Sequence, residues 1–117
     1  MYDVVIIGAG VSGCAVAREL SKYELNICVL EKETDICEGT SKANSGIVNA
    51  GFDPVPGTLC AKLNAPGAEM IAQIAKELDV PYKRNGTMVV CNDEENLSTL
   101  QILYKQGEIN GLRDCIF

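Results

Sequence analysis

The residues with the clearest chemical meaning in this chain of 117 residues form one glycine-rich segment, Gly8-Ala9-Gly10-Val11-Ser12-Gly13. Backbone N–H groups in such a segment can approach a phosphate closely, because a glycine has no Cβ to hold the ligand away. Glu31 follows eighteen residues after Gly13, and its carboxylate there can accept hydrogen bonds from both hydroxyls of a ribose. This spacing predicts a site for a dinucleotide.

The surrounding residues predict the elements that must position this segment. Residues 4–7 are a β-branched run typical of a parallel strand buried on both faces, and a second apolar run over residues 26–30 leads into Glu31. Gly8 allows a tight turn out of the first strand, and Gly13 lets the following helix lie close to it. We assign the buried face of that helix to Cys14, Ala17 and Leu20. Because both strands, the glycine turn, the helix and the terminal acid all fit a dinucleotide site, we favour dinucleotide binding over a βαβ turn that holds no phosphate.

Composition and charge narrow the class of protein. The chain is 47% hydrophobic and 22% charged, which is typical of one globular domain, and its net charge of −6 argues against nucleic acid or an anionic membrane as a partner. It contains no apolar run of the length that a membrane span requires. The first strand follows Met1 without a basic or signal-type segment, so we expect a cytoplasmic protein. The sequence gives no indication of the oligomeric state.

The six cysteines form neither a metal pattern nor a disulfide pattern. None is arranged as Cys-x-x-Cys, and the chain contains no histidine to complete a zinc site, so we expect no metal. Cys14 falls in the expected helix, and Cys28 and Cys91 fall in expected strands, which indicates buried thiols in a reducing compartment. Without histidine the commonest general base is absent, and a bound cofactor must carry any redox chemistry.

Residues 33–57 predict an unusually long loop, since they are rich in small polar residues and show no helical period. Residues 39–46 offer many hydrogen-bonding groups beside a backbone that a ligand can approach. They are equally consistent with a solvated connector whose serine and asparagine residues cap a short helix. The apolar residues 46–48 favour a loop that folds back onto the core.

A helix follows this loop. Thr58 is its expected N-cap, and the amphipathic pattern ends near Asp79. Pro66 interrupts the pattern, so we expect a break there, with Asn64 capping the second part.

The remaining residues predict a hairpin and a last helix. Short extended runs on either side of Asn85-Gly86 predict a β-hairpin over residues 82–91. Residues 92–95 predict a capping box for a helix that ends near Gly107 or Gly111.

With these features in place, the chain resembles the N-terminal part of FAD-dependent oxidoreductases of the D-amino-acid-oxidase type. Within that type it is similar to glycerol-3-phosphate dehydrogenases or oxidases and to L-2-hydroxyglutarate oxidases. The resemblance extends to about Gly111 and rests on residues 8–13, 31–32, 40–48, 56–59, 61–63 and 82–86. It implies an α/β fold: an incomplete Rossmann-like FAD-binding domain over residues 1–80 and the start of an α+β substrate domain over residues 81–117.

The resemblance also implies that the cofactor is FAD. It places the ADP half against the glycine-rich segment and Glu31, the adenosine beside Lys32, and the pyrophosphate and flavin along the loop. The implied cofactor-binding residues are Gly8, Gly10, Val11, Ser12, Gly13, Glu31, Lys32, Thr40, Ser41, Asn44 and Ser45. The implied reaction is hydride transfer from a hydroxyl-bearing carbon of a small anionic substrate to the flavin.

Two departures from the family pattern qualify this interpretation. Asn49 stands where the family usually has a histidine close to the flavin, and asparagine cannot take up a proton near neutral pH. Family members are also several times longer, so we interpret the chain as an N-terminal fragment or a prematurely ended reading frame. We expect it to bind FAD weakly or not at all and to have no turnover. The alternatives are an inactive remnant that at most binds a nucleotide or a partner chain, and a small NAD-binding module.

Overall fold

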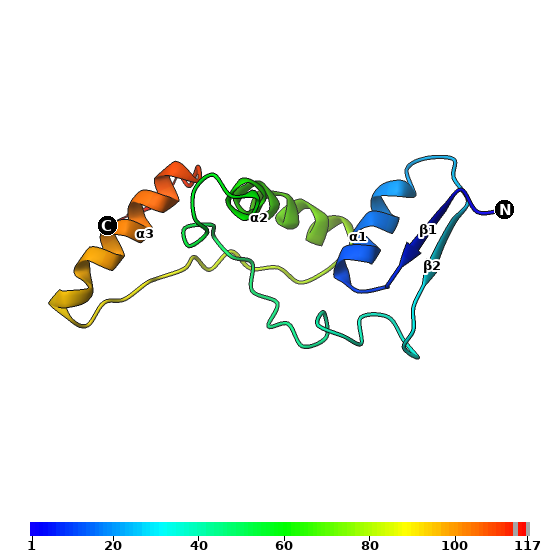
Figure 1. The fold of residues 1–117 in the computed structure, drawn as a ribbon, viewed down its shortest axis with the longest axis horizontal. Coiled ribbons are helices and arrows are strands. Elements are labelled where there is room, and N and C mark those ends of the chain that lie inside the picture. Colours follow the sequence, from blue (N-terminus) through cyan, green and yellow to red (C-terminus); the bar gives the residue numbers. More distant parts are fainter. Residues whose placement is uncertain (114, 117) are drawn as a thin grey trace. The chain divides into compact units, whose positions relative to one another are not determined.

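The computed structural model describes residues 1–113 and 115–116 (Figure 1). The chain forms two compact units, Met1–Ile47 and Val48–Phe117. The expected boundary at residue 80 separates two incomplete domains of a longer protein, whereas these units are clusters of contacts within this chain. The boundary therefore stays a prediction. Among the described residues, no helix has both the length and the apolar character needed to cross a membrane.

The first unit is built on two parallel strands joined by a helix. Strand β1 (Val4–Ile7) pairs in parallel with β2 (Ile27–Leu30), and α1 (Val11–Leu20) connects them, as the blue and cyan part of the ribbon shows in Figure 1. Two parallel strands need a crossover connection, and α1 supplies it. The expected strand–turn–helix–strand order and the α/β class are therefore confirmed.

Only one face of the first strand is covered. Exposure alternates along β1, and the side chains of Val5 and Ile7 are 50% and 89% exposed. The expectation that this strand is buried on both faces is therefore wrong, because α1 can cover only one face of the two-stranded sheet. The assigned inner face of α1 is confirmed as its more covered side, since Cys14, Ala17 and Leu20 are all half-buried.

The cores of both units are small. Among the described residues, the buried hydrophobic side chains are those of Ala9 in the first unit and of Ala61 and Ala75 in the second. Larger apolar side chains contribute only partly buried surface, and many are exposed. Because apolar burial is limited, specific backbone contacts and hydrogen bonds matter more than usual for each unit.

The second unit contains a long helix, α2 (Leu59–Glu77), that begins where the sequence predicts. Thr58 Oγ1 accepts a hydrogen bond from the backbone N–H of Ala61 at 3.2 Å, which confirms the predicted N-cap. The expected break at Pro66 is wrong, because α2 continues through it. A proline removes only one N–H donor, and turns on both sides maintain the helix here. Asn64 accordingly lies inside α2 instead of capping a second helix.

The predicted hairpin is not formed. Residues 80–92 have no regular secondary structure, although Gly86 keeps the positive φ of 79° that a turn needs. Met88 and Val90 are 85% and 69% exposed, so neither is covered by another element. A two-stranded hairpin is marginal in water without a third strand or a helix against its apolar face, and this segment has no such cover.

The last helix, α3 (Leu97–Ile109), follows a short 3-10 helix, η1 (Glu94–Asn96). The predicted capping box is wrong, since neither Asp93 nor Asn96 makes a side-chain cap to the helix that follows it. The backbone N–H of Asn96 instead bonds the Asp93 carbonyl at 3.1 Å and tightens the entry. The helix ends as expected near Gly111, whose φ is +91°.

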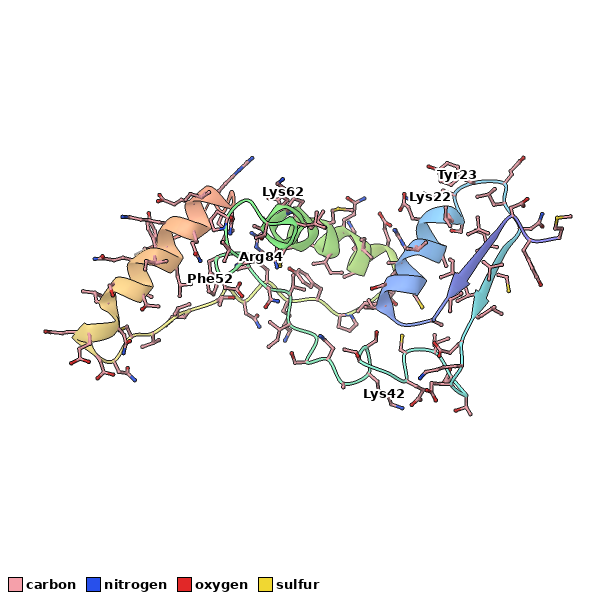
Figure 2. All side chains as sticks on the ribbon, viewed as in Figure 1. Lys22, Tyr23, Lys42, Phe52, Lys62 and Arg84 are labelled. Atoms are coloured by element: carbon pink, nitrogen blue, oxygen red, sulfur yellow. The ribbon has the colours of Figure 1, made fainter. Side chains whose placement is uncertain are left out.

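Helix α3 holds the loop of residues 51–54 with two side-chain amides. Asn110 Nδ2 donates to the carbonyl oxygens of Gly51 and Pro54 at 3.0 and 2.8 Å. Gln106 Nε2 donates to the carbonyl of Phe52 at 3.2 Å. A Cβ at Gly107 would lie 3.4 Å from the Phe52 Cβ, so the helix approaches the loop closely at this glycine. Phe52 is labelled in Figure 2. These hydrogen bonds from Gln106 and Asn110 form an amide clamp that joins residues more than fifty positions apart.

We expect Asn110→Ala to loosen this clamp. The substitution removes both donors to Gly51 and Pro54, and the loss should lower the free energy of unfolding by about 1–3 kcal/mol. Urea unfolding followed by circular dichroism measures the change. Gln101→Ala is the matched control, because Gln101 is exposed on the same helix. Equal stability of the two variants would contradict a structural role for the clamp.

Candidate functional site

The glycine-rich turn lies between β1 and α1 and takes the conformation that the sequence predicts. Gly8 has a φ of +101°, which L side chains rarely adopt, and its N–H donates to the Leu30 carbonyl at 2.7 Å. That bond ties the start of the turn to the end of β2. The end of β2 therefore brings Glu31 to the turn.

Gly13 allows the close approach between helix and strand. A Cβ at this position would overlap the carbonyl oxygen of Gly8 and would lie 3.4 Å from Cγ2 of Ile6. Any side chain at residue 13 would therefore push α1 away from the turn. The predicted role of Gly13 in helix–strand packing is confirmed.

Glu31 binds the backbone of the glycine-rich turn. Its Oε2 accepts the N–H of Ala9 at 2.7 Å, and its Oε1 accepts the N–H groups of Lys32 and Glu33 at 2.8 and 3.1 Å. These bonds lower the pKa of the Glu31 carboxyl below its usual value of 4.5, and the bond from Ala9 has the largest effect. The carboxylate is thus fixed beside the turn, whereas its predicted contact with a ribose stays a prediction.

Ser41 supplies the cap that the first residues of α1 lack. Gly10 is the N-cap and has no side chain, and the N–H of Val11 donates instead to Oγ of Ser41 at 2.8 Å. A Cβ at Gly10 would lie 3.1 Å from this oxygen, so the glycine makes room for it. Because Oγ accepts from Val11, the hydroxyl proton of Ser41 is available for another acceptor.

The other predicted residues of the loop are more exposed. Thr40, Asn44 and Ser45 are all exposed; the Asn44 Oδ1 accepts the N–H of Gly46 at 2.7 Å, which closes a local turn. Lys42, labelled in Figure 2, pairs with Glu38 at 2.7 Å. Asn44 and Lys42 therefore make local polar contacts, whereas Ser41 is the loop side chain that reaches α1.

The structure also corrects one expectation for this region. Ile47 and Val48 are 71% and 36% exposed, so the prediction that residues 46–48 fold back onto a core is wrong. The cores of the two units are too small to cover them. Lys32 is exposed and pairs with Glu33 at 3.3 Å, and Asn49 is an exposed residue of the second unit.

Ala9 is a central residue of the site that sequence analysis did not single out. It is 3% exposed, its N–H is bound by Glu31, and its carbonyl oxygen accepts the N–H of Cys37 at 3.0 Å. Its position between two glycines is a weak signal for a small residue. No sequence signal points to Cys37 as its partner.

This arrangement fits a ligand that carries a phosphate. The turn has no Cβ at the points of closest approach, and the N–H groups of the first turn of α1 have no acceptors within the helix. The positive end of the helix dipole adds to their attraction for an anion. In the described part of the chain, no cluster of three or more His, Cys, Asp or Glu could hold a metal ion.

Comparison with known proteins agrees with this geometry. The family described as FAD dependent oxidoreductase matches residues 3–116. The chain is 54% identical over 112 residues to glycerol 3-phosphate dehydrogenase of Caloramator mitchellensis, covering 96% of the chain and 23% of that protein. It is 39% identical over 115 residues to mitochondrial L-2-hydroxyglutarate dehydrogenase of Nematostella vectensis, covering 97% of the chain and 25% of the relative.

A solved structure is also similar. Dithionite-reduced L-alpha-glycerophosphate oxidase from Mycoplasma pneumoniae with FAD bound matches with a TM-score of 0.76 and 36% sequence identity, over 97% of this chain and 30% of that one. These matches confirm the family resemblance drawn from the sequence. The chain spans about a quarter of the length of the curated relatives.

Paired glycine substitutions test the close packing of the turn. Gly13→Ala introduces a Cβ into the Gly8 carbonyl and should lower the free energy of unfolding by about 1–3 kcal/mol. Gly67→Ala in α2 meets open space and should stabilise the chain by about 0.5–1 kcal/mol. Urea unfolding measures both. A Gly13→Ala protein as stable as the parent would contradict the contact.

The lowered pKa of Glu31 predicts a dependence of stability on pH. Because the carboxylate is favoured in the folded state, its contribution is present above the unfolded value of 4.5 and is lost as pH falls through the lower folded value. Glu31→Gln should therefore be less stable than the parent at neutral pH and approach it in acid. Glu24→Gln, at an exposed site, is the control. An unfolding series across this pH range would refute the prediction if the difference stayed constant.

Proposed function

Because the chain belongs to the family of FAD dependent oxidoreductases, we propose that it is the N-terminal, cofactor-binding part of such an enzyme. The observation that carries this proposal is that Glu31 and Ser41 both bind the backbone of the glycine-rich turn. Similarity to glycerol 3-phosphate and L-2-hydroxyglutarate dehydrogenases supports a small anionic hydroxy compound as the substrate class.

The residues of the first unit have distinct roles in this proposal. The N–H groups at the start of α1 face the pyrophosphate, and Gly10 lets it approach. The Ser41 hydroxyl accepts from Val11 and donates its own proton to a phosphate oxygen. Glu31 accepts from one ribose hydroxyl with the lone pair of Oε2 that Ala9 leaves free, since the N–H groups of Lys32 and Glu33 occupy Oε1. The outer part of the site is lined by Lys32, Thr40, Asn44 and Ser45.

FAD, when bound, supplies the acceptor for a hydride from a hydroxyl-bearing carbon. Asn49 can orient a substrate or the flavin by donating or accepting a hydrogen bond, but it cannot serve as the general base. We further propose a Rossmann-like domain over residues 1–80, the start of a substrate domain over residues 81–117, and a cytoplasmic location.

A second candidate function is nucleotide binding without turnover. The exposed apolar surface of both units favours it, since the fully buried hydrophobic residues among those described are three alanines. In that case the chain binds a nucleotide or a partner chain but lacks a formed substrate site.

Amide NMR titration with FAD, ADP and FMN tests the proposal. FAD and ADP should shift the amide signals of residues 8–13 and of Ser41, even if binding is weak, while FMN leaves them unchanged. Signals from α3 serve as an internal reference. Equal shifts with FMN, or none at residues 8–13 with FAD, would refute the proposed site. Shifts that are identical with ADP and FAD along the whole chain would favour nucleotide binding alone, because the flavin half would then meet no residue of the chain.

We expect Ser41→Ala to weaken FAD binding by roughly fivefold to tenfold, the effect of about one hydrogen bond. Ser21→Ala is the matched control, because the Ser21 hydroxyl bonds the Arg18 carbonyl at the opposite end of α1. The same titration gives both affinities. If the Ser41→Ala protein binds FAD with the same affinity as the parent, Ser41 is not part of the binding site.

A further inference from the structure

Two thiols meet at the carbonyl oxygen of Ala9 in the glycine-rich turn. Cys14 Sγ donates to this oxygen from α1 at 3.4 Å, and Cys37 Sγ donates to it from the loop after β2 at 3.5 Å. The two thiols are also near enough that Cys14 contributes to raising the pKa of Cys37. Both side chains are half-buried. The first unit thus brings together two cysteines that are far apart in the sequence.

The backbone fixes Cys37 in this position. Its φ is +61°, in the left-handed region that residues other than glycine seldom adopt, and its N–H donates to the Ala9 carbonyl at 3.0 Å. A residue held in such a conformation depends on its surroundings to keep it there. The bond to Ala9 therefore sets where the Cys37 thiol lies relative to Cys14.

The surroundings keep Cys37 protonated at neutral pH. Burial raises the pKa of its thiol, and the neighbouring Cys14 and the carboxylates of Asp35 and Glu31 raise it further. A protonated thiol can donate to the Ala9 carbonyl, as observed. Cys37 accordingly rests as the thiol.

We propose that Cys14 and Cys37 are a site of oxidation by peroxide and form a reversible disulfide that links α1 to the loop after β2. The Cys14 thiol loses its proton, and the thiolate attacks one oxygen of hydrogen peroxide as the O–O bond breaks. A sulfenic acid forms on Cys14, and the hydroxide that leaves takes up the released proton to become water. The second thiol attacks that sulfur, an S–S bond forms, and a second water leaves. Two electrons pass from the sulfurs to the peroxide, and an external dithiol reverses the step.

The disulfide changes the contacts of the turn. It withdraws both S–H donors from Ala9 and joins residues 23 positions apart by a covalent bond. Closing such a loop restricts the unfolded chain, so oxidation raises the thermal midpoint of unfolding. Neither effect depends on a bound cofactor, and the inference stands apart from the proposed function.

The sequence makes the test unambiguous. Trypsin cleaves after lysine and arginine, so every cysteine falls on a different peptide: Cys14 on residues 1–18 and Cys37 on residues 33–42. The full chain is treated with hydrogen peroxide, alkylated with iodoacetamide and digested. We expect the dominant cross-link to join these two peptides, with a loss of about 2 Da relative to their summed mass, and to disappear with dithiothreitol.

Variants and unfolding supply the controls. Cys14→Ser should abolish the cross-link, while Cys60→Ser, at an exposed cysteine of α2, should leave it unchanged. The parent chain oxidised in urea should instead give mixed cross-links, because proximity is then lost. The proposal would be overturned if, after oxidation of the native chain, both cysteines were found alkylated on separate peptides. It would also be overturned if sulfinic acid formed without a cross-link. Both results come from the parent chain, so they hold even if a variant fails to fold.

Discussion

The close approach of α1 to β1 is the constraint on which the first unit depends. It exists because residue 13 has no side chain, so the helix can lie directly against the Gly8 carbonyl. Because of this approach, the first turn of the helix lies at the end of the sheet, next to Glu31, which directly follows β2. A displacement of α1 would therefore separate the helix N-terminus from both Glu31 and Ser41.

Hydrogen bonds from side chains to backbone groups hold the tertiary structure of each unit, because the small cores bury little apolar surface. In the first unit, a carboxylate and a hydroxyl reach the glycine-rich turn from later in the chain. In the second, the amides of Gln106 and Asn110 hold the loop of residues 51–54. Each of these four side chains binds a backbone group distant in sequence, so together they fix tertiary structure with little apolar burial.

Sequence reasoning succeeded where local rules decide the structure. The two strands, α1 and the Thr58 cap follow from apolar runs, glycine positions and side-chain type within a few residues. It failed where the structure of a segment depends on what packs against it or flanks it. The predicted hairpin at residues 82–91 has no covering element and does not form. Helix α2 continues through Pro66 because helical turns flank the proline on both sides. Glu31 was expected from its spacing, but its bond to Ala9 was not. Ser41 came only from the family resemblance, since no local pattern reveals a cap supplied from thirty residues away.

The two side chains that bind the turn differ in charge, and this difference bears on what the site can accept. Glu31 places a negative charge beside Ala9, which favours hydroxyl donors and disfavours a phosphate on the ribose 2′ position. Ser41 caps α1 with a neutral group, so the positive end of the helix dipole stays uncompensated. An acidic cap in its place would neutralise that end and repel a phosphate. The turn therefore has a negatively charged side at Glu31, which favours hydroxyl donors, and a positive side at the start of α1, which favours an anion.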